Sequence, residues 1–146
     1  MRNKHYDVFN GDADGILSLV QLRLAEPKPS ILISGVKRDI ALLKNVAALE
    51  SGTPVPKGFS MTVLDISLDK NVVELEKLLR QGASVTYFDH HSAARIPDHP
   101  NLHATIDTDA KLCTALLVDR YLNGKYHLWA ITAAYGDNLV AVANDL

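Results

Sequence analysis

Short apolar runs alternate with longer amphipathic stretches along most of the chain. The apolar and β-branched runs predict strands at residues 6–9, 30–35, 61–65, 83–89 and 102–106. Apolar positions recurring at helical spacing predict helices at 16–25, 39–49, 71–82, 110–122 and 127–135, with a further helix in the closing residues 139–146. Two prolines and two glycines in residues 51–58 predict a loop there.

This alternation predicts an α/β domain with a mainly parallel sheet of about five strands, flanked by helices in Rossmann-like layers. The 146 residues suffice for one domain with a sizeable core, so residues 1–146 are treated as one unit. Cys113 and Trp129 stand among apolar residues of predicted helices, which predicts that both are packed in the core. In such a sheet, ligands gather at the carboxyl ends of the strands.

Acidic residues and histidines follow the ends of several predicted strands. Asp12 and Asp14 follow the first strand, Asp65 ends the third, and Asp89 ends the fourth, directly before His90 and His91. We expect these side chains to open onto the same edge of the sheet. Carboxylates that meet without cations repel one another, and divalent metal ions would offset that repulsion.

The stretch "NGDADG" at residues 10–15 has two other interpretations, as a helix cap and as a calcium-binding loop. Asp12 or Asp14 could cap the helix that follows, although one aspartate suffices for that. Asn10, Asp12, Asp14 and Gly15 also match the opening of an EF-hand calcium loop. That loop needs a glutamate where Gln21 stands and a helix where the sequence predicts a strand, so both features disfavour it.

The same stretch resembles the haloacid dehalogenase phosphatases, in which the first aspartate of D-x-D-G attacks phosphorus. That family places a threonine or valine where Ile16 stands and a lysine before later acidic residues, for which the chain has no clear equivalent. The interpretation also leaves His90 and His91 without a role.

Four motifs together resemble the DHH phosphoesterase superfamily. In family order they are "NGDADG" at 10–15, "VLD" at 63–65, "DHH" at 89–91 and "AAYGDN" at 133–138, and they span almost the whole chain. Members include RecJ-like single-strand exonucleases, oligoribonucleases, exopolyphosphatases and manganese-dependent pyrophosphatases. Family enzymes usually continue into a smaller substrate-binding domain, so the resemblance implies a DHH domain truncated before it.

The resemblance implies hydrolysis with two divalent ions, which neutralise the phosphoryl oxygens and activate the attacking water. Oxygen and imidazole ligands suit Mn²⁺, with Mg²⁺ possible. By resemblance, Asp65 bridges both ions, and the other ligands are divided between two sites: Asp14, His90 and Asp137 on one, and Asp12 and Asn10 on the other.

The resemblance also assigns catalytic roles to His91 and Asp89, in addition to Asp65. His91 is expected to face the substrate phosphate as a positive donor or general acid, with Asp89 orienting it or ligating directly. Val8 stands where the pyrophosphatase and oligoribonuclease branches carry a histidine, and Asn10 stands where the exonuclease branch has an aspartate. A neutral amide oxygen is a poorer ligand than a carboxylate, so we expect the ion on the Asp12 side to be the weaker one.

The sequence therefore predicts a metal-dependent phosphoesterase acting on single-stranded nucleic acid or short oligonucleotides. A non-catalytic nucleotide- or nucleic-acid-binding relative and a phosphoanhydride hydrolase of the pyrophosphatase type remain the alternatives. The oligomeric state stays open.

Composition adds constraints on partners and location. A net charge of −2 and a pI of about 6.3 give no bulk attraction for polyanions, so any nucleic-acid contact must be local. The lone Cys113 excludes an internal disulfide and fits a reducing cytosol. The first residues lack the apolar core of a signal peptide, and no apolar run is long enough to span a membrane, so a cytoplasmic location is expected.

Overall fold

A computed structural model describes residues 4–52 and 58–146, and its centre is an all-parallel sheet of five strands in the order β2-β1-β3-β4-β5. The predicted α/β class and parallel sheet are therefore confirmed. The strands are β1 (His5–Asn10), β2 (Ile31–Gly35), β3 (Ser60–Leu64), β4 (Ser84–Asp89) and β5 (Leu102–Ile106).

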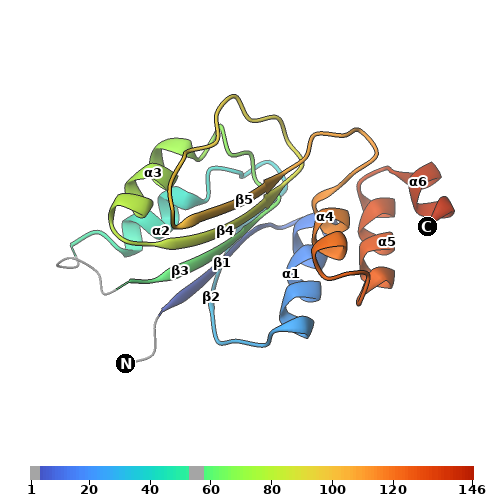
Figure 1. Ribbon diagram of the computed structural model, residues 1–146, viewed down its shortest axis with the longest axis horizontal. Coiled ribbons are helices and arrows are strands. Elements are labelled where there is room, and N and C mark those ends of the chain that lie inside the picture. The colour runs from blue at the N-terminus through green and yellow to red at the C-terminus, as the bar shows by residue number, and fades with distance from the viewer. Residues whose placement is uncertain (1–3, 53–57) are drawn as a thin grey trace.

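Helices lie on both faces of the sheet, with α2 and α3 on one face and α1 and α4 on the other (Figure 1). Helices α5 and α6 pack beyond α4 and form a small core with it. The helices are α1 (Ala13–Ala25), α2 (Leu43–Leu49), α3 (Val72–Arg80), α4 (Thr114–Tyr121), α5 (His127–Gly136) and α6 (Val140–Asp145).

The strand order places a topological switch point beside β1. The chain passes from β1 to β2 on one side and then returns to add β3, β4 and β5 on the other. Connections therefore leave the carboxyl ends of β1 and β3 in opposite directions, and in α/β sheets ligands bind at such a point. Most of the predicted site residues come from the ends of β1, β3 and β4, and Asp137 follows the end of α5.

Two helices begin later than the periodicity predicts. Helix α2 begins at Leu43 rather than at residue 39, and α4 begins at Thr114 rather than at residue 110. Helix α1 instead begins at Ala13, because Asp12 accepts a hydrogen bond from the Gly15 N–H and caps it. The predicted loop at 51–58 lies mostly outside the described residues.

Cys113 and Trp129, which were both predicted to lie in the core, differ in burial. Cys113 is fully buried in the core between α4 and α5, as predicted. Trp129 is 44% exposed, so the prediction that it lies in the core is wrong. Helix α5 presents Trp129 outward because its small residues, Ala130, Ala133 and Ala134, make the buried contacts.

In the part of the chain that the structure describes, every helix is too short or too polar to cross a bilayer.

Candidate metal centre

The imidazole of His90 lies at the centre of the predicted site. Its Nε2 is 3.2 Å from Asp65 Oδ1, 3.5 Å from Asp14 Oδ2 and 3.9 Å from Asp137 Oδ2. These carboxylates come from the loop after β3, the first turn of α1 and the end of α5. The structure therefore brings together four of the predicted residues from four separate segments.

Asp137 reaches this cluster because α5 approaches α1 closely. It follows the last residue of α5, Gly136, where an added Cβ would lie 2.7 Å from the Cβ of Ala13. Only a glycine lets the end of α5 pack so tightly on the start of α1. Burial and the neighbouring Asp14 raise the pKa of Asp137.

Asp14 is held by the amino terminus of α4. Its Oδ2 accepts a hydrogen bond from the Thr114 N–H at 3.0 Å, and its Oδ1 accepts one from the Ala115 N–H at 2.8 Å. The capping interpretation is thus correct for Asp12, which caps α1, whereas Asp14 caps α4 rather than its own helix. The contacts fix the carboxylate while leaving Oδ2 beside His90.

Asp65 is buried and held in a left-handed backbone conformation, with φ of 62°. Such a conformation is costly for a residue with a side chain and is concentrated at functional sites. Its N–H donates to the Phe88 carbonyl, and its Oδ1 accepts a hydrogen bond from the Thr114 hydroxyl at 3.0 Å. Burial and the nearby carboxylates of Asp14 and Asp12 raise the pKa of Asp65 to about 10.

His91 pairs with the buried carboxylate of Asp89. The distance from His91 Nδ1 to Asp89 Oδ1 is 2.6 Å, and the hydrogen bond that His91 donates to Asp89 is the main reason that the pKa of His91 is raised. The ring of His91 is 44% exposed and lies 4.3 Å, centroid to centroid, from that of His90. Asp89 thus fixes an accessible imidazole beside the cluster.

Asn10 and Asp12 lie at the edge of the cluster. Asn10 Nδ2 donates to the Lys37 carbonyl, and its buried Oδ1 has no hydrogen-bond partner among the residues that the structure describes. Asp12 Oδ1 accepts from the Gly15 N–H, and its Oδ2 lies 3.8 Å from the Lys37 ammonium. Asp12 therefore accepts a hydrogen bond on one oxygen and has a cation 3.8 Å from the other.

The described residues offer two groups of three potential metal ligands. One group is Asp65, His90 and His91, and the other is Asp14, His90 and Asp137, with ligand atoms within 4.8 Å of one another in each. His90 belongs to both groups, and Asp12 belongs to neither. The clustered carboxylates, the high pKa of Asp65 and the unpaired Oδ1 of Asn10 all fit a divalent cation bound by oxygen and nitrogen.

Thr114 is a residue of this site that sequence reasoning missed. Its backbone N–H holds Asp14 and its hydroxyl holds Asp65, so one residue orients two of the potential ligands. No motif in the sequence marks Thr114, because it falls inside the helix predicted at 110–122.

The calcium-loop interpretation of residues 10–15 is contradicted by the structure. Strand β1 precedes this stretch where an EF-hand needs a helix. At the glutamate position, Gln21 is buried and donates to the carbonyls of Leu17 and Ala115.

The raised pKa values predict that the metal-free protein loses stability as the pH rises. The pKa values of Asp65 and His91 are higher in the folded protein than in the unfolded chain. The unfolded chain therefore releases these protons at lower pH, and the free energy of unfolding falls as the pH rises. Between pH 5.5 and 8.5 we expect Tm in EDTA to fall, with a limit of about 1.4 kcal/mol per pH unit for each group.

Differential scanning fluorimetry across that range measures the effect. The Asp65→Asn variant should show a flatter profile, because an amide does not titrate. A wild-type Tm that rises with pH in EDTA would contradict the prediction.

The fold is shared with a nuclease. The structure is similar to that of exonuclease RecJ bound to manganese, with a TM-score of 0.59 and 17% identity over 92% of this chain and 38% of that one. RecJ-like exonucleases are members of the superfamily that the four motifs resemble, so the comparison confirms the resemblance at the level of the fold.

A second solved structure, an uncharacterized protein from Helicobacter pylori G27, is also similar. Its TM-score is 0.53 and its identity 18%, over 85% of this chain and 36% of that chain. The present chain thus spans less than two fifths of either protein. A scan against models of protein families finds no match, and neither does a search of curated proteins.

Proposed function

We propose that this chain is the metal-binding domain of a phosphoesterase that hydrolyses phosphodiester bonds, with single-stranded nucleic acid or short oligonucleotides as substrates. The observation that carries the proposal is the convergence of three carboxylates from distant segments within 4 Å of one imidazole nitrogen, His90 Nε2. The likeness in fold to an exonuclease bound to manganese supports the substrate class and the choice of Mn²⁺.

The proposed ligands of the better-held ion are Asp14, Asp65, His90 and Asp137. When bound, divalent ions would neutralise phosphoryl oxygens and lower the pKa of a coordinated water. Asp65 would also contact a second ion, on the side of Asp12 and Asn10. We propose that this second ion binds more weakly, because Asn10 offers a neutral amide oxygen there and Asp12 Oδ1 already accepts a hydrogen bond from the Gly15 N–H.

Of the other residues, His91 is proposed to act on the substrate, and Asp89 and Thr114 are proposed to hold their neighbours in place. His91 is accessible, and Asp89 holds its Nδ1 and raises its pKa, which favours the imidazolium at neutral pH. We propose that His91 Nε2 gives its proton to the leaving oxygen of the phosphodiester. Thr114 keeps Asp14 and Asp65 in place, so the carboxylates need not reorganise during the reaction.

The test is metal binding followed by hydrolysis. Isothermal titration of the metal-free protein with Mn²⁺ should show one tight and one weaker site. The loaded protein should hydrolyse bis-p-nitrophenyl phosphate and shorten a labelled single-stranded oligonucleotide, and EDTA should stop both reactions.

The outcomes separate the candidate functions. The absence of Mn²⁺ binding would overturn the proposal. Binding of Mn²⁺ and oligonucleotide without hydrolysis would favour the non-catalytic relative, and release of phosphate from pyrophosphate alone would favour the phosphoanhydride hydrolase. Two equally tight Mn²⁺ sites would contradict the weaker site beside Asp12.

A further inference from the structure

The loop between β2 and α2 lies against the opening motif. The Gly11 N–H donates to the Gly35 carbonyl at 3.0 Å, and Asn10 Nδ2 donates to the Lys37 carbonyl at 3.2 Å. A Cβ at Gly11 would lie 2.1 Å from the Gly35 carbonyl oxygen, so only glycine permits this close approach. Two segments that are distant in sequence are thereby fixed to each other, and the main chain of Lys37 is held beside the candidate site.

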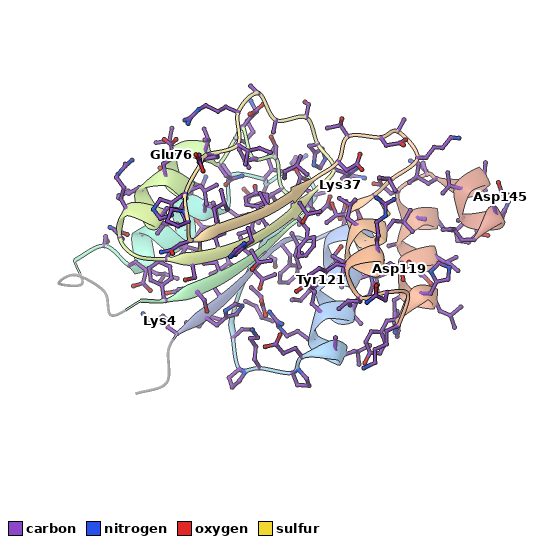
Figure 2. The ribbon with its side chains drawn as sticks, viewed as in Figure 1. Lys4, Lys37, Glu76, Asp119, Tyr121 and Asp145 are labelled. Carbon is purple, nitrogen blue, oxygen red and sulfur yellow. The ribbon has the colours of Figure 1, made fainter. Side chains whose placement is uncertain are left out.

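The side chain of Lys37 lies toward the carboxyl ends of the strands, where the site residues converge (Figure 2). Its ammonium is 3.8 Å from Asp12 Oδ2, and the side chain is 69% exposed. Within residues 4–52 and 58–146, this is the one ion pair between a lysine or arginine and any of Asp12, Asp14, Asp65, Asp89 and Asp137.

The contact with Asp12 is too weak to confine the ammonium. Exposed ion pairs of this length contribute about 0–1 kcal/mol, so the lysine can turn to a stronger partner at little cost. A phosphate oxygen is such a partner, because charge-assisted hydrogen bonds to phosphate are stronger than most. Lysine binds phosphate as a compact, mobile point charge.

Charge balance gives Lys37 a role in holding the substrate. The carboxylates of Asp12, Asp14, Asp65 and Asp137 repel an incoming phosphate, and neither potential ligand group includes Asp12. We infer that Lys37 is a substrate-binding residue, whose ammonium contacts a non-bridging oxygen of the phosphate on the Asp12 side of the site. The inference rests on the proposed function and adds to it a residue that binds the phosphate of the substrate.

The experiment measures phosphate binding without turnover. The Mn²⁺-loaded protein is titrated with adenosine 5′-monophosphate, and adenosine serves as the ligand that lacks the phosphate. Lys37→Ala should weaken binding of the monophosphate about tenfold, and Lys37→Arg should retain most of it, because the lost contact is one charge-assisted hydrogen bond. Adenosine binding should not change.

The matched control is Lys125→Ala, which removes an exposed lysine before α5, at the opposite end of that helix from Asp137. It should bind the monophosphate as the wild type does. A separate titration with Mn²⁺ should give Lys37→Ala an affinity equal to or above that of the wild type, since the variant loses a cation beside Asp12.

Four results would overturn the inference. Unchanged monophosphate affinity in Lys37→Ala would exclude the contact. Reduced Mn²⁺ affinity in that variant would show that Lys37 supports the metal site rather than binding the phosphate. A wild-type protein that binds Mn²⁺ but not the monophosphate would refute the inference and leave the metal centre standing. A wild-type protein that binds no Mn²⁺ would refute the proposed function and this inference with it.

Discussion

Replacing Asp65 with alanine should abolish Mn²⁺ binding and phosphodiester hydrolysis together. Asp65 is buried, lies 3.2 Å from His90 Nε2 and has a pKa raised by burial and by Asp14 and Asp12. Residues that only orient a metal ligand contribute about 10–100-fold to affinity or activity, so loss of a central ligand should exceed that range. Isothermal titration and the hydrolysis of bis-p-nitrophenyl phosphate measure the two effects.

The Tm of each variant distinguishes loss of the metal site alone from loss of the fold. Without metal, Asp65→Ala should have a Tm equal to or above that of the wild type near neutral pH, because a carboxyl group whose ionisation is opposed by the fold is gone. Asp145→Ala, which removes an exposed carboxylate from α6 (Figure 2), should leave Mn²⁺ affinity unchanged. Retained Mn²⁺ binding in Asp65→Ala would show that Asp65 is not the bridging ligand.

Replacing Arg23 with leucine should destabilise the protein by about 3–5 kcal/mol, because it leaves a buried carboxylate without its cation. Asp7 is fully buried in β1, and Arg23 from α1 binds both of its oxygens. Burial alone would raise the pKa of Asp7, but hydrogen bonds from His5, Arg23 and Ser30 outweigh it and hold that pKa well below its usual range. Urea denaturation at pH 7 measures the loss.

Arg120→Leu provides the matched control. Arg120 is exposed on α4 and lies 3.8 Å from the half-exposed Asp107, so its loss should cost no more than about 1 kcal/mol. Below about pH 4, the difference in free energy of unfolding between the Arg23 variant and the wild type should shrink. At that pH Asp7 becomes protonated in the unfolded chain, and also in the folded variant, where Arg23 no longer lowers its pKa. Equal stability of the Arg23 and Arg120 variants would contradict the prediction.

The central strands β1, β3 and β4 were predictable because most of their residues are buried. Strands β1, β3 and β4 sit in the middle of a parallel sheet, and their sequences read as short apolar runs with few interruptions. Strand β5 has the predicted bounds, Leu102–Ile106. The parallel arrangement followed from the alternation of strands with helices, since parallel strands need crossover connections.

The starts of α2 and α4 were not predictable from periodicity, because distant groups determine them. The Leu43 N–H donates to Asn71 Oδ1, and the first N–H groups of α4 donate to Asp14. Both acceptors belong to segments far away in the sequence. A search for a capping residue directly before each helix cannot find them.

The clustering of the candidate ligands was predictable for a topological reason. Asp65, Asp89 and His90 follow strands whose carboxyl ends share one edge, and any parallel sheet would bring them near one another. Asp137 could be placed only by the motif resemblance, because its position depends on how α5 packs on α1. Thr114 and Lys37 carry no signal of their own and become visible only through their contacts with Asp65, Asp14 and Asp12.

The hydrogen bonds that Asp14 accepts from the start of α4 couple the stability of α1 to that of α4. If α4 and α5 detached from α1 by local unfolding, Asp14 would lose its two amide donors and the cluster would lose Asp137. A cation bound between Asp14 and Asp137 would resist that opening, because detachment would cost its binding free energy as well. Amide hydrogen exchange in α4 and α5 should therefore slow when the ion binds, while exchange in α2 and α3 should change little.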